Sequence, residues 1–141
     1  MKPIIVLDAS VAVKWFVHDV SSDEASLVAH KYKFIAPNLI MTEVANALWT
    51  YARRGDVSSQ DLVSALKILD KRISLLNQLS IVQMASQLAC DLNHPVYDCM
   101  YLAVSRMQHL PLLTADKRLV KIATSEMGLE VVDLNQIPLD K

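Results

Sequence analysis

Residues 4–16 of the chain read IIVLDASVAVKWF, and this stretch decides the fold class. Its first residues are apolar and mostly β-branched, which predicts a buried strand over residues 3–7. The next segment, residues 9–17, has the pattern of a short helix. Asp8 lies at the junction, so an acidic side chain is expected at the carboxyl end of a buried strand.

The rest of the chain repeats this alternation of strand and helix. Further strands are expected over residues 34–36, 73–79, 111–114 and 129–134. Helices are expected over residues 21–32, 38–54, 58–71, 81–92, 95–107 and 116–126. The sequence Ser21-Ser22-Asp23-Glu24 is a capping box, Gly55 is suited to end a helix, and Pro95 is suited to begin one. No hairpin signature separates the strands, so the sheet should be mostly parallel, with about five strands and helices on both faces.

Composition limits the class of protein. The chain has 141 residues, of which 52% are hydrophobic and 21% charged, so residues 1–141 are expected to form a single domain. The apolar surplus suggests a subunit or partner surface. The net charge of −1 excludes a general polycation, so any contact with nucleic acid requires a local basic patch. The apolar run before Asp8 is too short for a signal peptide or membrane span, and we expect a soluble cytoplasmic protein with no membrane contact.

Four acidic residues are the main functional signal. Asp8 and Asp116 follow predicted strands, and Glu43 and Asp98 lie about one turn after Pro37 and Pro95. In open α/β sheets, the functional site lies at the carboxyl ends of the strands. Carboxylates that converge there repel one another and stay ionised together only if a cation lies between them. The pattern therefore predicts a divalent metal site and metal-assisted hydrolysis.

Simpler interpretations of each acid remain open. Asp8 and Asp116 are equally suited to cap helices, and Asp98 in a first helical turn complements the helix dipole. Glu43 lies in an otherwise apolar segment, where a carboxylate needs a partner. Asn46, one turn later, is expected to orient it by a hydrogen bond.

The local sequences around these acids are together more specific than any one acid. They are Asp8-Ala9-Ser10, Glu43-Val44-Ala45-Asn46, residues 97–103 (YDCMYLA) and residues 113–119 (LTADKRL). In this order and spread they resemble the PIN-domain nucleases, and residues 6–16 look like the VapC-type toxins of toxin–antitoxin pairs. The resemblance covers essentially the whole chain. It implies a three-layer α/β/α sandwich with a twisted sheet and Mg²⁺ or Mn²⁺ held by Asp8, Glu43, Asp98 and Asp116. It also implies an RNA substrate, a homodimer and a cognate antitoxin.

Several polar residues are candidates for supporting roles. Ser10 and Thr114 are expected near Asp8 and Asp116, although Ser10 is equally suited to cap a helix. Candidate contacts to RNA phosphates are Lys117, Arg118 and Lys121, with Lys14, Arg53 and Arg54 as weaker ones. A solvated helix face is the competing interpretation for all of them. His94, four residues before Asp98, is expected to be a turn residue and not a metal ligand.

Other chemistries lack their residues. With two glycines, Gly55 and Gly128, the chain can form neither a P-loop nor a dinucleotide-binding loop. Ser10 has no nucleophile elbow around it, and the four histidines have no zinc spacing. For the RNA substrate that the resemblance implies, the expected reaction is attack of a metal-activated water on a phosphodiester, leaving 5′-phosphate and 3′-hydroxyl ends. Two alternatives remain open, a catalytically silent interaction module and a metal-dependent small-molecule phosphohydrolase.

Overall fold

The computed structural model describes residues 1–139 of the chain. They form one five-stranded sheet in which all neighbouring strands are parallel, in the order β3-β2-β1-β4-β5. The strands are β1 (Ile4–Leu7), β2 (Lys33–Pro37), β3 (Ile73–Leu76), β4 (Leu112–Thr114) and β5 (Val131–Asp133). The predicted parallel sheet of about five strands is confirmed.

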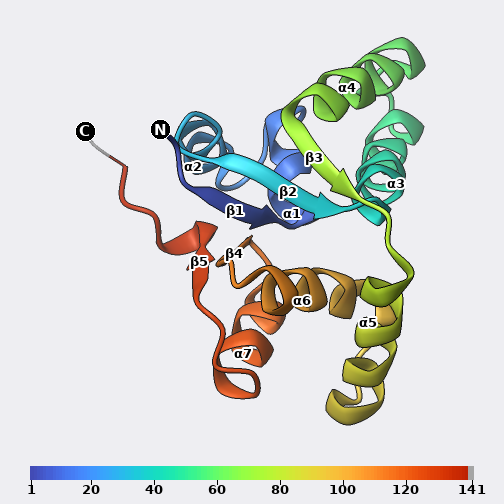
Figure 1. Ribbon diagram of the computed structural model, residues 1–141. Coiled ribbons are helices and arrows are strands. Elements are labelled where there is room, and N and C mark those ends of the chain that lie inside the picture. The colour runs from blue at the N-terminus through green and yellow to red at the C-terminus, as the bar shows by residue number, and fades with distance from the viewer. Residues whose placement is uncertain (140–141) are drawn as a thin grey trace.

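Helices connect successive strands and cover both faces of the sheet (Figure 1). They are α1 (Ala9–Ala12), α2 (Ser22–Val28), α3 (Leu39–Arg53), α4 (Ser59–Arg72), α5 (Leu79–Leu92), α6 (Val96–Gln108) and α7 (Lys117–Ser125), with 3₁₀ turns η1 (Val13–Trp15) and η2 (Leu134–Gln136). The arrangement is the expected three-layer α/β/α sandwich. None of the helices within residues 1–139 has the length and apolar composition needed to cross a bilayer.

The central strands are buried because helices lie on both sides of them. Ile5, Val6 and Leu7 of β1 and Leu112 and Leu113 of β4 are all fully inaccessible to solvent. Continuous apolar runs of this kind are typical of strands in parallel sheets. These side chains belong to a buried cluster that includes apolar residues of α3, α4, α5, α6 and α7.

The register of β1 and β4 brings two segments that are distant in sequence to the same sheet edge. Val6 pairs with Leu112 and Leu7 with Leu113. The amide of Asp8 then donates to the carbonyl of Leu113 over 3.0 Å. Asp8, which follows β1, and Thr114, the last residue of β4, therefore lie next to each other at the carboxyl edge.

The predicted capping box at the start of α2 is wrong. Ser21 has a left-handed backbone (φ 65°) and its side chain does not cap the helix. Instead, the Ser22 hydroxyl accepts a hydrogen bond from the Asp19 amide (2.8 Å) and donates one to the Val17 carbonyl (3.1 Å). These bonds tie the helix start to the preceding loop.

Some predicted boundaries were too long and others were accurate. α2 ends at Val28, four residues early; residues 9–17 form one α-helical turn followed by a 3₁₀ turn; and β3 ends at Leu76. The signals at the ends of the long helices were correct. Ser58 caps α4 by accepting from the Asp61 amide, and Gly55 follows α3 with a φ of 84°.

Candidate active site

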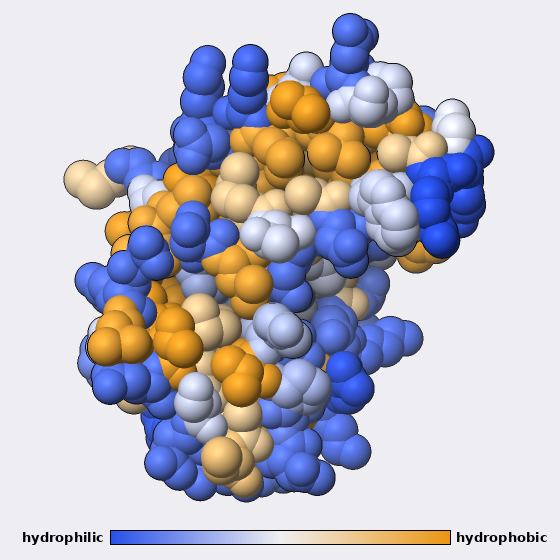
Figure 2. Space-filling view, turned by 90° about the vertical axis from the view of Figure 1, so that its right-hand side faces the viewer, coloured by the Kyte–Doolittle hydropathy of each residue, from blue (hydrophilic) through white to orange (hydrophobic). Residues whose placement is uncertain are grey.

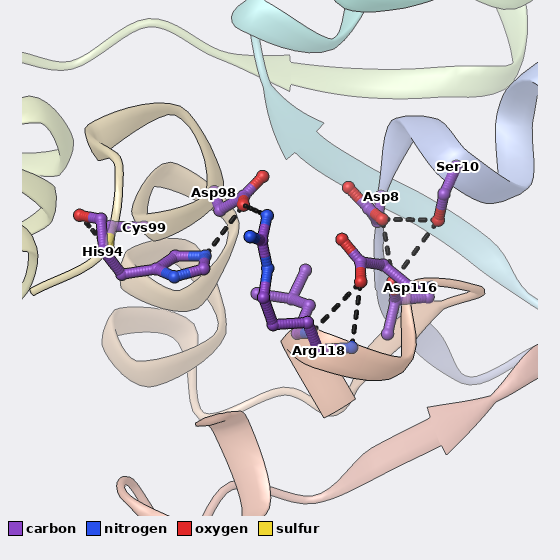
Figure 3. Close-up of polar contacts among 9 residues, drawn as sticks. Asp8, Ser10, His94, Asp98, Cys99, Asp116 and Arg118 are labelled. Atoms are coloured by element: carbon purple, nitrogen blue, oxygen red, sulfur yellow. Dashed lines mark hydrogen bonds and ion pairs between the residues drawn. The ribbon is translucent and has the colours of Figure 1, made fainter. Parts of the chain in front are cut away.

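The four acidic residues come from four different elements and lie at the carboxyl edge of the sheet. Asp8 follows β1, Glu43 lies on α3, Asp98 in the first turn of α6, and Asp116 directly before α7. Figure 3 shows Asp8 and Asp116 side by side, with Asp98 facing them across the side chain of Arg118. Glu43 is close enough for the charges of Asp8 and Asp98 to raise its pKa.

Asp8 is held by two hydroxyl groups. Ser10 Oγ donates to Asp8 Oδ2 over 2.5 Å, and Thr114 Oγ1 donates to the same oxygen over 2.7 Å. The Ser10 hydroxyl accepts from the Ala115 amide and the Thr114 hydroxyl from the Asp116 amide, each over 3.0 Å. Because the amides occupy hydroxyl lone pairs, both hydroxyl protons are directed at Asp8. The Asp8 side chain makes no hydrogen bond that caps α1, so the helix-capping interpretation does not account for Asp8.

The charge on Asp8 is electrostatically costly in this position. Asp8 is only 6% exposed, and this burial raises the pKa of its carboxyl group. The bonds from Ser10 and Thr114 oppose the rise, while the charges of Asp98 and Asp116 add to it. A cation bound among these carboxylates would stabilise the ionised form of Asp8.

Glu43 is oriented by a residue on another helix. The hydroxyl of Tyr101, whose ring is fully buried, donates to Glu43 Oε1 over 2.5 Å. Burial is also the main cause that raises the pKa of Glu43. Among the described residues, Asn46 makes no hydrogen bond to Glu43, so the orienting role expected for Asn46 belongs to Tyr101. Asn46 is exposed and, with Tyr97 and Glu43, lines an open pocket of about 260 Å³ beside the acids.

Asp98 contacts two basic side chains. His94 Nε2 lies 2.8 Å from Asp98 Oδ2, and Arg118 lies 3.7 Å from the same oxygen. His94 is 8% exposed, so it is a buried partner of Asp98 and not only a turn residue. Arg118, one of the predicted phosphate contacts, therefore lies between Asp98 and Asp116.

Asp116 has a structural role, as the simpler interpretation expected. Its Oδ1 accepts from the amides of Arg118 (2.9 Å) and Leu119 (3.4 Å), which caps α7. This role uses only one carboxylate oxygen.

The four carboxylates share one arrangement. Each engages one oxygen with an internal donor, and within residues 1–139 the other has no protein hydrogen bond. The free atoms are Oδ1 of Asp8, Oδ1 of Asp98, Oδ2 of Asp116 and Oε2 of Glu43. None of them is shut off from solvent. The internal donors thus fix the side chains and leave an accessible set of oxygen ligands.

This donor set fits a hard divalent cation. Within residues 1–139, no three His, Cys, Asp or Glu side chains lie close enough together to hold a metal ion by themselves. Mg²⁺ prefers oxygen ligands and keeps several of its waters, so it is bound through one or two carboxylates and does not need a closed protein cage. An open set of carboxylate oxygens, with no thiolate in it, matches Mg²⁺ or Mn²⁺ better than Zn²⁺.

The basic candidates fall into two groups. Lys117 and Lys121 are exposed on α7 and, within the described part of the chain, have no carboxylate within 4 Å. Lys14 instead donates to the Val20 carbonyl over 2.6 Å and stabilises the loop before α2. Arg53 and Arg54 lie over the rings of Trp49 and Tyr51, away from the acids along α3.

Comparison with known proteins agrees with the fold. The chain is 29% identical over 121 residues to Ribonuclease VapC3 of Pyrobaculum aerophilum, which covers 83% of this chain and 92% of that protein. VapC20 of Mycobacterium tuberculosis, described as a toxin that cleaves the sarcin–ricin loop, superposes with a TM-score of 0.71 at 18% identity over 92% of this chain and 98% of VapC20. A toxin–antitoxin complex from Klebsiella pneumoniae gives a TM-score of 0.66 at 15% identity over 94% of this chain and 99% of that one.

At these identities the two structural likenesses establish the fold. The family follows from the sequence itself, because the PIN domain pattern matches residues 5–125, from β1 to the end of α7. That match includes all four acids and most of the chain. We conclude that this protein belongs to the PIN domain family.

Proposed function

We propose that this protein is a divalent-metal-dependent endoribonuclease and the toxin of a VapBC-type toxin–antitoxin pair. The observation that carries the proposal is the shared arrangement of the four carboxylates. Each is fixed through one oxygen and leaves the other accessible at one edge of the sheet. The likeness to Ribonuclease VapC3 supports RNA as the substrate. Because RNA is the proposed substrate, we place the protein in the cytoplasm.

The proposed roles of the acids follow from their surroundings. Asp8, Asp98 and Glu43 would hold one Mg²⁺ or Mn²⁺ directly or through its bound waters, and Asp116 would complete that site or help to hold a second ion. When bound, the cation supplies an activated water and neutralises the charge that develops on the phosphate. Ser10 and Thr114 keep the free oxygen of Asp8 aimed at the site because their protons fix its other oxygen.

Substrate positioning is assigned to the basic residues next to Asp116. Lys117 and Lys121 are one turn apart on α7 and exposed, so both are available to phosphates. Arg118 balances the charge of Asp98 in the structure and would turn to the substrate phosphate when a metal takes its place. Lys14 is the weaker candidate, since its ammonium group already bonds the loop.

Apolar surface supports the proposed partners, a cognate antitoxin and a second copy of the chain. Figure 2 shows apolar side chains gathered over the end of the molecule formed by α3 and α4. Large hydrophobic side chains that are exposed on these and the following helices include Trp49 on α3, Val63 and Ile68 on α4, Leu79 on α5 and Tyr97 on α6. A related structure was solved as a toxin–antitoxin complex. We therefore propose that these helices carry the partner surfaces.

The test combines metal binding with cleavage. Millimolar Mn²⁺ should raise the Tm of the wild type by mass action on the folded state, and the protein should then cut RNA but not in EDTA. The variant Asp98→Asn keeps the shape of the side chain and should lose both effects. Equal cleavage by Asp98→Asn and the wild type would refute the proposal, and a Tm shift without RNA cleavage would favour a small-molecule phosphohydrolase. A deoxynucleotide at the cleaved position should not prevent cutting, because the 2′-hydroxyl is not the nucleophile.

A further inference from the structure

A second polar pocket lies at the amino edge of the sheet, opposite the acids. It has a volume of about 490 Å³, and four cationic side chains contribute to its wall. We call it the basic pocket, and its key residues are Lys2, Tyr32, Lys33, Phe34, Lys71 and Arg72. Figure 1 shows this edge, where β1 and β2 begin and α4 runs into β3.

The sheet register brings these cations together from three parts of the sequence. Lys33 is the first residue of β2 and pairs with Ile4 of β1, two residues after Lys2. Lys71 and Arg72 end α4 immediately before β3. Because the three strands start at the same edge, the four positive charges share one surface.

Among the residues that the structure describes, no acidic one lines this pocket. Among residues 1–139, none of its four cations has a carboxylate within 4 Å. The dipole of α4 accounts for basic residues at its last turn but not for Lys2 and Lys33. In a chain with a net charge of −1, four cations without a carboxylate partner in one concave surface create a locally positive potential, which attracts anions.

Part of the pocket is rigid. The guanidinium of Arg72 donates to the Ala29 carbonyl over 2.9 Å and lies 5.7 Å from the centre of the Trp15 ring. The Trp15 ring packs on Phe34 at 5.2 Å, and Tyr32 lies 6.4 Å from Phe34. A fixed cation therefore borders an aromatic wall, with flexible lysines around it.

We propose that the basic pocket binds the phosphates of single-stranded RNA at a distance from the cleaved bond. The proposal rests on RNA being the substrate. Lysine charges beside a half-buried tyrosine ring favour RNA over an acidic peptide, because single-strand sites combine cations for the backbone with aromatic rings for the bases. Strands of four or five residues at about 3.3 Å per residue place this pocket roughly 15 Å from the acids. Only a longer RNA that passes around the sheet can reach both sites.

The test compares two double variants that each remove two positive charges. Lys33→Ala/Lys71→Ala removes charges from the pocket, and Lys67→Ala/Arg106→Ala removes two exposed charges outside it. Binding of a long single-stranded RNA is measured against salt in an Asp8→Asn background, without turnover. The pocket variant should lower the log–log salt slope by about 1.4, at about 0.7 per lost phosphate contact. The control should leave the slope unchanged.

Cleavage by the otherwise wild-type protein provides the second measurement. The pocket variant should raise KM for the long RNA and leave kcat, and both constants for a short oligonucleotide, unchanged. Equal salt slopes for the two double variants would overturn the proposal. Binding of polyglutamate, a probe for an acidic peptide, is measured in parallel. The proposal would also be overturned if the pocket variant lost polyglutamate binding but kept RNA binding. Because the salt slope needs no turnover, it decides about the pocket even if the wild type cleaves no RNA.

Discussion

His94 lies in the turn before α6, and its Nε2 is 2.8 Å from Oδ2 of Asp98 in the first turn of that helix. An ionised carboxylate only accepts hydrogen bonds, so Nε2 of His94 carries the ring proton and donates a hydrogen bond to Asp98. The imidazole is buried, whereas Asp98 is partly open to the site. His94 is therefore a positioning residue, which fixes one oxygen of Asp98 and leaves the other free for a cation.

Replacement of His94 should weaken metal binding without removing a ligand. Partners behind a metal ligand typically contribute about 10- to 100-fold in metal affinity or activity. We expect His94→Ala to raise the Mn²⁺ concentration needed for a given Tm shift by that factor. His18→Ala, at an exposed position, is the control and should not change it. A His94→Ala variant that keeps wild-type Mn²⁺ affinity would contradict the positioning role.

Tyr101→Phe should change the pH dependence of cleavage. The hydroxyl of Tyr101 lowers the pKa of Glu43, so its removal should raise that pKa further. If cleavage needs ionised Glu43, the acid limb of the kcat/KM profile should move to higher pH. Loss of the bond should also cost about 1 kcal/mol of folding free energy.

Tyr51→Phe is the matched control for that experiment. The Tyr51 hydroxyl also donates to a carboxylate, Asp19 Oδ2 over 3.0 Å, but outside the acidic site. Its removal should leave the acid limb in place. An unmoved limb in Tyr101→Phe as well would separate Glu43 from the ionisation that controls cleavage.

Asp8→Asn should stabilise the metal-free protein while it abolishes cleavage. The pKa of Asp8 in the folded protein is raised above 3.8. Between the unfolded pKa of 3.8 and the higher folded-state pKa, the folded state binds more protons than the unfolded state. The free energy of unfolding therefore falls as the pH rises through this range. Asparagine avoids this loss, so the gain should be complete above the folded-state pKa of Asp8 and vanish below the unfolded pKa.

The measurement is the Tm of both proteins in EDTA across pH. A gain of about 1 kcal/mol corresponds to roughly 4 °C for a domain of this size. Mn²⁺ should reverse the order at neutral pH by stabilising only the wild type. A variant that is less stable than the wild type in EDTA at pH 7 would show that the hydroxyl bonds outweigh the cost of the buried charge.

The sheet was predictable because its signals are local. Each strand is a short apolar run, and the helix ends at Ser58 and Gly55 depend on neighbouring residues only. The start of α2 was not predictable in this way. The left-handed backbone of Ser21 and the bonds of Ser22 depend on how the loop before it folds back.

The site residues show the same difference between local and distant signals. The positions of the acids follow from strand ends and prolines, which a sequence displays directly. Partners that are distant in the sequence do not follow in this way: Tyr101 lies 58 residues from Glu43, and Thr114 lies 106 residues from Asp8. His94 had a local signal, since it lies only four residues before Asp98, in the turn between α5 and α6. Because Asn93 and His94 have the sequence of a turn, the sequence did not indicate that the imidazole is buried.

Asp116 offers the clearest separation of a structural role from a catalytic one. Its Oδ1 caps α7, and Asn caps a helix about as well as Asp, whereas Ala at a cap costs about 1 kcal/mol. We therefore expect Asp116→Asn to keep the wild-type Tm in EDTA and Asp116→Ala to lower it by roughly 4 °C. Both variants remove the free Oδ2 and its charge. If that oxygen helps to hold the metal, cleavage should fall about 100-fold or more in both, since each tenfold corresponds to about 1.4 kcal/mol of lost transition-state stabilisation. Wild-type cleavage by Asp116→Asn would reduce Asp116 to a helix cap and leave Asp8, Glu43 and Asp98 as the only carboxylates at the site.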